Sequence, residues 1–192
     1  MIRRLYQWTM GLAASPNAVI ALFLVALAES SFFPIPPDVL LLPMVLAQPK
    51  KGFWFATVCT IGSAIGGAFG YLIGQEFMHI IGEPIIQFYG AADRYEHLGE
   101  LFRQYDVWII AIAGFSPIPY KLFTISAGAF GSNFAIFFLV SILSRGARFF
   151  LVAALLRWGG DRLRLLVEKH LELLTVIILL LVISTFILIK LL

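Results

Sequence analysis

The hydrophobic residues of this chain fall into long runs, and the polar residues collect between them. The runs 53–74, 134–156 and 173–192 each hold roughly the 20 residues that one apolar helix needs to cross a bilayer. Two further apolar stretches, 15–47 and 107–130, are interrupted near their middle. This pattern predicts an all-α integral membrane protein, a helical bundle in which residues 1–192 form a single membrane domain.

The two interrupted stretches are predicted to be hairpins of broken helices that enter and leave the bilayer on the same side. Each has two short apolar arms around a proline-rich apex, and proline removes a backbone donor and prevents a continuous helix. The apex prolines are Pro34, Pro36 and Pro37 in the first hairpin and Pro117 and Pro119 in the second. We therefore expect two re-entrant elements rather than two ordinary spans.

The two apices are similar in sequence. Phe, Pro, Ile and Pro recur in the same register in 32–38 and 115–121, and this register places Asp38 opposite Lys121. One full span, 53–74, separates the hairpins and would put them on opposite sides of the membrane, which is the inverted repeat of many transporters. We predict that the apices meet near the middle of the bilayer and that Asp38 pairs with Lys121.

Two of the spans have contrasting compositions. Within 53–74, glycines recur every four residues and so share one helix face, where another backbone can approach closely: Gly62, Gly66, Gly70 and Gly74. The last run, 173–192, carries no ionisable residue before Lys190 and is interpreted as an accessory, lipid-facing brace. The segments 75–106 and 157–172 are polar and amphipathic.

Composition argues against a water-soluble domain and against a nucleic-acid-binding protein. Hydrophobic residues make up 60% of the chain and charged residues 13%, whereas soluble domains carry about a quarter charged residues. The net charge of +3 is small, and no basic stripe is interleaved with aromatic residues. Cys59 is the only cysteine, which excludes an internal disulfide and a CxxC metal site.

The basic residues between the spans are distributed unevenly. If both hairpins are re-entrant, Arg94 and Arg103 lie on one side of the membrane and eight others lie on the opposite side: Arg3, Arg4, Lys50, Lys51, Arg157, Arg162, Arg164 and Lys169. The positive-inside rule assigns the side with eight basic residues to the cytoplasm.

Five ionisable residues lie inside the apolar stretches: Glu29, Asp38, Lys121, Arg145 and Arg148. A charge near the bilayer centre costs about 2.5–3.5 kcal/mol, so each is a candidate functional residue. We expect the three basic side chains to bind the phosphate of a substrate. Desolvation disfavours a charged carboxylate, so we expect Glu29 and Asp38 to take up protons. For the two arginines, structural pairing is an equal alternative.

Enzymatic chemistry is not indicated. His79, His97 and His170 fall in separate polar segments without metal-binding spacing, so we expect no metal and no cofactor. A membrane enzyme that acts on lipid phosphate and a structural or assembly factor are the alternatives to a transporter. A homo-oligomer is also compatible with the sequence.

At several of these residues the chain resembles the DedA family, whose domain is also called VTT or SNARE-associated, and within it the YqaA-like branch. The resemblance covers roughly residues 15–160 and is carried by four features: Glu29 with Pro34 and Pro36, the segment Gly66-x-x-x-Gly70-Tyr71-x-x-Gly74, the apex Phe115-x-Pro117, and Gly128. It implies two facing re-entrant hairpins in a multi-pass protein of the bacterial plasma (inner) membrane.

The resemblance also implies a substrate class, namely polyprenyl phosphates or phospholipid head groups that are moved across the bilayer. Many DedA proteins carry an arginine directly before the phenylalanine of the second apex and another six residues later. Here these positions are Gly114 and Tyr120, and Lys121 follows one residue further on. We therefore expect a transporter of an anionic lipid without naming the lipid.

Overall fold

The computed structural model describes residues 17–31, 36–88, 90, 92–116 and 119–159, and its elements are helical. In chain order these elements are α2 (Ala18–Ser31), α3 (Asp38–Ala47), η1 (Pro49–Lys51), α4 (Gly52–Phe77), η2 (Met78–Gly82), α5 (Glu83–Phe88), α6 (Ala92–Phe115), α7 (Tyr120–Ala129) and a last helix, Phe134–Gly159. The predicted accessory span 173–192 lies outside the described residues, as do Pro34 and Pro117.

Among the described residues, two helical segments are long and apolar enough to cross a membrane, and this agrees with the predicted all-α membrane protein. They are Pro49–Gly82, which comprises η1, α4 and η2, and the helix Phe134–Gly159. Helices α2 and α3, with 14 and 10 residues, are shorter. One boundary differs from the prediction, because position 107 lies inside α6, which runs without a break from its polar first half into its apolar second half.

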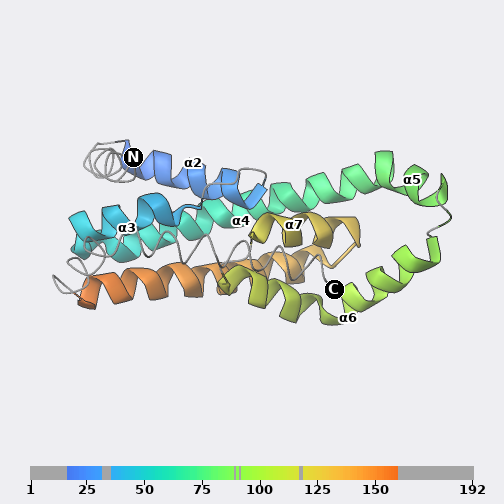
Figure 1. Ribbon diagram of the computed structural model, residues 1–192. Helices are drawn as coiled ribbons and strands as arrows, with labels where there is room; N and C mark the ends of the chain where they lie inside the picture. Colours follow the sequence, from blue (N-terminus) through green and yellow to red (C-terminus); the bar gives the residue numbers. More distant parts are fainter. Residues whose placement is uncertain (1–16, 32–35, 89, 91, 117–118, 160–192) are drawn as a thin grey trace, which may run out of the picture.

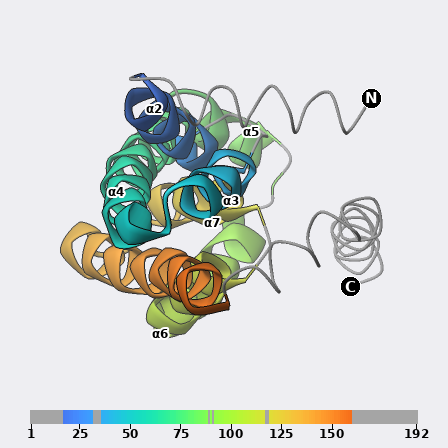
Figure 2. The ribbon, with the colours of Figure 1, turned by 90° about the vertical axis from the view of Figure 1, so that its left-hand side faces the viewer.

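The short helices lie alongside the two halves of α4 (Figure 1). Helices α2 and α3 accompany its first half, whereas α6 and α7 occupy the end of the bundle where α4 finishes. The view along the bundle places α3 in front of α7, so these two helices lie roughly in line with each other (Figure 2). In Figure 1, α2 ends and α7 begins near the middle of the bundle.

Proline determines where α3 and α7 begin. Pro37 is the N-cap residue of α3, with φ of −65°, and Pro119 is the N-cap residue of α7, with φ of −58°. A helix start does not require a backbone donor, and the fixed φ of proline suits the first turn. Asp38 and Lys121 therefore both lie in the first turn of a short helix.

In the part of the chain that the structure describes, the core consists of two apolar clusters, one toward each end of the bundle. The larger cluster joins α2, α3, the first half of α4 and the end of the last helix, and includes Leu22, Leu41, Met44, Phe55 and Phe149. The smaller cluster joins α4, α6, α7 and the start of the last helix, and includes Tyr71, Ile110, Tyr120 and Phe137. Buried polar residues gather elsewhere, among them Glu29, Ser30, Ser31, Ser63, Thr124, Ser141 and Arg145.

The glycine face of α4 lies against two different helices. A Cβ at Gly66 would stand 2.8 Å from the carbonyl carbon of Leu27 in α2, which is closer than real Cβ atoms approach. A Cβ at Gly74 would stand equally close to the carbonyl carbon of Ile125 in α7. Thus α4 holds α2 with one half of this face and α7 with the other, and it sets the position of both helices near the middle of the bundle.

Candidate functional site

The end of α2 carries a buried ion pair. Arg145 from the last helix donates from Nη2 to Oε2 of Glu29 at 2.6 Å, and the two side chains are 2% and 11% exposed. The Nε of Arg145 donates to the hydroxyl of Ser63 at 2.7 Å, and the hydroxyls of Ser63 and Ser30 lie 2.7 Å apart. Ser30 in turn donates to Oε2 of Glu29. A closed ring of hydrogen bonds therefore joins α2, α4 and the last helix.

Aromatic rings cover the guanidinium of Arg145. Its Cζ lies 4.9 Å from the ring centre of Tyr120 and 4.8 Å from that of Phe149, both within the range of cation–π contacts. The hydroxyl of Tyr120 donates to Ser141, so this ring is itself held in place. Burial, two polar partners and two rings leave little room for a further ligand on Arg145.

The two positions at which the family resemblance would place arginines both lie beside Arg145. Tyr120 contributes one of the covering rings, and a Cβ at Gly114 would stand 3.6 Å from the Cγ of Arg145 and much closer to the side chain of Ser144. Both positions thus adjoin the one arginine that the last helix buries here.

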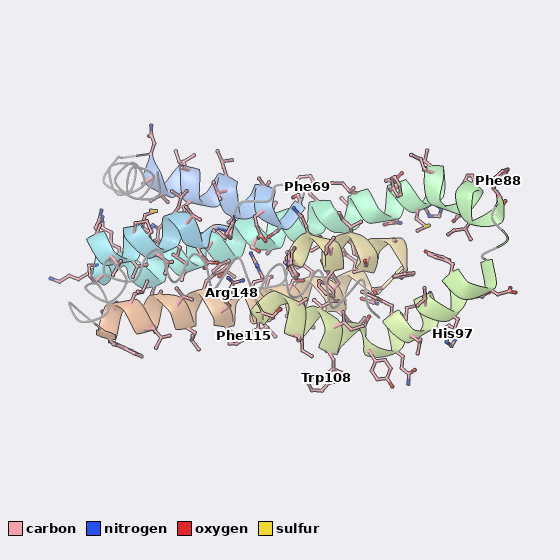
Figure 3. All side chains as sticks on the ribbon, in the orientation of Figure 1. Phe69, Phe88, His97, Trp108, Phe115 and Arg148 are labelled. Atoms are coloured by element: carbon pink, nitrogen blue, oxygen red, sulfur yellow. The ribbon has the colours of Figure 1, made fainter. Side chains whose placement is uncertain are left out.

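A second ion pair lies one helical turn along the last helix. Arg148 donates from Nη2 to Oδ2 of Asp38 at 2.5 Å, and the side chains are 20% and 19% exposed. From Nη1 it also donates to the carbonyl of Ser116 at 3.2 Å. Figure 3 shows Arg148 between the helices, whereas Phe69 and Trp108 point outward. Arg148 therefore contacts one residue of each similar segment, Asp38 at the first apex and Ser116 at the second.

The predicted pair between Asp38 and Lys121 is wrong, because Asp38 is bound to Arg148. A planar guanidinium offers several donors in a fixed fork, so one arginine can serve a carboxylate and a carbonyl together, which a lysine ammonium does less well. Lys121 is half-buried, and the ion pairs among the described residues do not include it. The two apices are joined, but through the last helix.

Sequence reasoning missed Ser63, Ser30 and Tyr120 as parts of this site. Ser63 is one of several hydroxyl-bearing residues inside an apolar span, next to Gly62, and such residues commonly bond to their own helix backbone. Its only signal was a position beside the glycine face, where another helix comes close. Tyr120 was considered only as a departure from the family pattern.

A second polar region lies between α5 and α6, away from the ion pairs. It is a groove of about 330 Å³ lined by Glu83, Ile86, Gln87, Tyr95, Glu96, Gly99 and Arg103. Tyr95 and Arg103 donate to the carbonyls of Ala129 and Phe130 at the end of α7. Burial raises the pKa of Tyr95, Glu83 adds to this rise, and Arg103 opposes it. These hydrogen bonds fasten the polar half of α6 to α7.

The described residues contain no group of three or more His, Cys, Asp or Glu side chains that could hold a metal ion. His79 lies beside Glu83, with Nδ1 and Oε1 3.3 Å apart, and both side chains are largely exposed. Cys59 is buried and makes no disulfide. The chemistry on offer in the middle of the bundle is thus that of carboxylates, guanidinium groups and hydroxyls.

Comparisons with known proteins identify a domain family and relatives of similar length. The VTT domain matches residues 35–157, a range that includes the second half of the first apex, the whole second apex, Arg145 and Arg148. An uncharacterized protein of Haemophilus influenzae is 41% identical over 168 residues, which cover 88% of this chain and 87% of the relative. An uncharacterized protein of Histophilus somni is 38% identical with the same coverage. No solved structure matches the chain.

Proposed function

The chain belongs to the VTT domain family, also called the DedA family, and on that premise we propose that it is a transporter for an anionic lipid head group. The substrate class is a lipid phosphate, such as a phospholipid or a polyprenyl phosphate. We place the protein in the bacterial plasma (inner) membrane, where it passes the bilayer several times.

The observation that carries this proposal is an unbalanced positive charge among apolar helices. Glu29 and Asp38 are each matched by an arginine, and Lys121 is left half-buried without an ion pair in the described part of the chain. A charge in such surroundings is unfavourable unless it is compensated. An anionic head group would provide the compensation.

The three basic residues contribute in different ways to phosphate binding. Arg148 has a partly exposed guanidinium, and Lys121 has a flexible ammonium, so these two side chains are suited to touch the phosphate. Arg145 adds positive potential from within the bundle while it stays bound to Glu29. Freed backbone N–H groups at the apices add further donors.

Protons provide a means of coupling in this proposal, because a carboxylate that loses its proton can take its arginine back and displace the head group. Glu29 and Asp38 each hold an arginine, and protonation of a carboxylate weakens its attraction for that arginine. Changing Glu29→Gln and Asp38→Asn preserves size and removes titration. Transport by these variants should lose its dependence on pH. Unchanged pH dependence in folded variants would rule out coupling through these residues.

We further propose that α2 with α3, and the second half of α6 with α7, are re-entrant hairpins in an inverted repeat. Two features support this arrangement: α2 and α3 are, over their described residues, too short to span a bilayer singly, and α2 ends and α7 begins near the middle of the bundle. In a Cys59→Ser background, single cysteines at Lys50 and Arg162 should be labelled from the cytoplasm, and one at Arg94 from outside. Labelling of Lys50 and Arg94 from the same side would exclude the inverted arrangement.

Reconstitution tests the function directly. In liposomes that carry a fluorescent phosphatidic acid and have this chain as their only protein, the labelled lipid should move between leaflets faster than in protein-free liposomes. Arg148→Gln should bring the rate close to that of protein-free liposomes, and Lys190→Gln, far along the sequence, serves as the matched control. Equal rates with and without the wild-type protein would contradict the proposal.

An enzyme acting on lipid phosphate and an assembly factor remain the alternative functions. Chemical change of the labelled lipid in the same liposomes would identify an enzyme. An assembly factor would neither move nor change the lipid, but loss of the protein would alter the assembly of other membrane proteins.

A further inference from the structure

Two arginines of the last helix, Arg145 and Arg148, hold the two carboxylates in unlike surroundings. Arg145 is 2% exposed, whereas Arg148 is 20% exposed. Arg145 donates from Nε to Ser63 and from Nη2 to Glu29. The rings of Tyr120 and Phe149 also cover its guanidinium. Arg148 has no such cover among the described rings.

The partners of Arg148 have a further property in common, because they belong to the two apices. Asp38 is the first residue of α3, and Ser116 follows the last residue of α6. One guanidinium holds the side chain of one and the backbone carbonyl of the other. If Arg148 binds another acceptor, its hydrogen bonds to Asp38 and to the carbonyl of Ser116 are lost together.

A lipid phosphate is an acceptor that can compete for this guanidinium. Its oxygens match the planar fork of arginine and carry charge, whereas the carbonyl of Ser116 is neutral. A phosphate could not compete as well for Arg145, since two aromatic side chains and a closed network of hydrogen bonds enclose its guanidinium. We therefore expect the pair of Arg148 with Asp38 to be exchangeable and the pair of Arg145 with Glu29 to be fixed.

We propose that Arg148 is a latch between the two apices, and that an anionic head group opens it by replacing Asp38 and the Ser116 carbonyl while Arg145 stays bound to Glu29. This inference rests on the proposed function and adds how binding is linked to opening. Asp38 acts as an internal competitor that keeps the apices together until the head group arrives.

If Asp38 competes with the head group, removing its charge should increase the affinity for the head group, whereas loss of a merely structural pair would not. Asp38→Asn removes the competing charge and should bind dihexanoyl phosphatidic acid about fivefold more tightly, the factor expected for a partly exposed ion pair. Glu29→Gln should tighten binding less than Asp38→Asn does, because rings and hydrogen bonds keep Arg145 from the head group. Titration calorimetry in detergent measures both, and inorganic phosphate as a second probe distinguishes recognition of a lipid from recognition of free phosphate.

Opening is measured with spin labels on the first turns of α3 and α7. Val39 and Leu122 are exposed there, so cysteines at these positions in a Cys59→Ser background can carry the labels. Dihexanoyl phosphatidic acid should lengthen the distance between the labels, and dihexanoyl phosphatidylcholine, which has no net charge, should do so less. In Arg148→Gln the distance should be long from the start and insensitive to the probe.

The outcomes separate the latch from the transport function. Tighter binding by Asp38→Asn together with a distance that lengthens on binding supports the latch. Binding and transport with an unchanged distance, or weaker binding by Asp38→Asn, overturns the latch and leaves the transport function standing. Absence of binding and of transport in the wild-type protein overturns both.

Discussion

The two ion pairs made by the last helix are alike in chemistry and different in their surroundings. Arg145 with Glu29 is closed in by hydroxyls and rings, and Arg148 with Asp38 is open on one side and spans the two apices. The comparison teaches that an ion pair inside a membrane protein is not by itself a sign of transport. What matters is whether another ligand can reach it.

The largest expected effect is on stability at the closed pair. Arg145→Gln leaves Glu29 buried without its partner, and such a loss costs about 3–5 kcal/mol of unfolding free energy. Arg145→Lys should recover only part of this, because an ammonium does not reproduce the fork that reaches both Ser63 and Glu29. Unfolding in detergent, followed by circular dichroism, measures the difference. A loss no greater than that of Arg148→Gln would erase the distinction between the pairs.

A smaller effect is expected when α2, which carries Glu29, is pushed away from α4. Gly66→Ala places a methyl group against the backbone of Leu27, and overpacking of this kind costs about 1–3 kcal/mol. Gly67→Ala is the matched control on the same turn, because its nearest neighbours would lie at 3.6 Å, an ordinary contact. The control should match the wild-type protein in thermal unfolding. Equal loss in both variants would mean that α2 is not held by this contact.

The open pair should matter least for stability. Arg148→Gln removes a partly exposed ion pair, which is worth up to about 1 kcal/mol, yet it should abolish most lipid transport. Unfolding and liposome transport are measured on the same preparation. A large loss of stability with transport retained would reverse the roles of the two arginines.

The charged residues of the site could be found from sequence because a charge in an apolar run is conspicuous. Their partners could not, since Arg145 and Arg148 are three residues apart on one helix face and either could meet either carboxylate. The register of the two apices said nothing about the rotation of the last helix, which decides the pairing. The start of α6 was missed because no proline or glycine separates its polar half from its apolar half at position 107.

The partner of Asp38 is the point on which the account depends most, and a double-mutant cycle measures it. Asp38→Asn is combined with Arg148→Gln in one cycle and with Lys121→Gln in another, and unfolding free energies are compared. We predict a coupling of at least about 0.5 kcal/mol with Arg148, as for residues in contact, and additive effects with Lys121. Coupling of Asp38 to Lys121 with additivity toward Arg148 would contradict the assignment of Arg148 as the residue that joins the two apices.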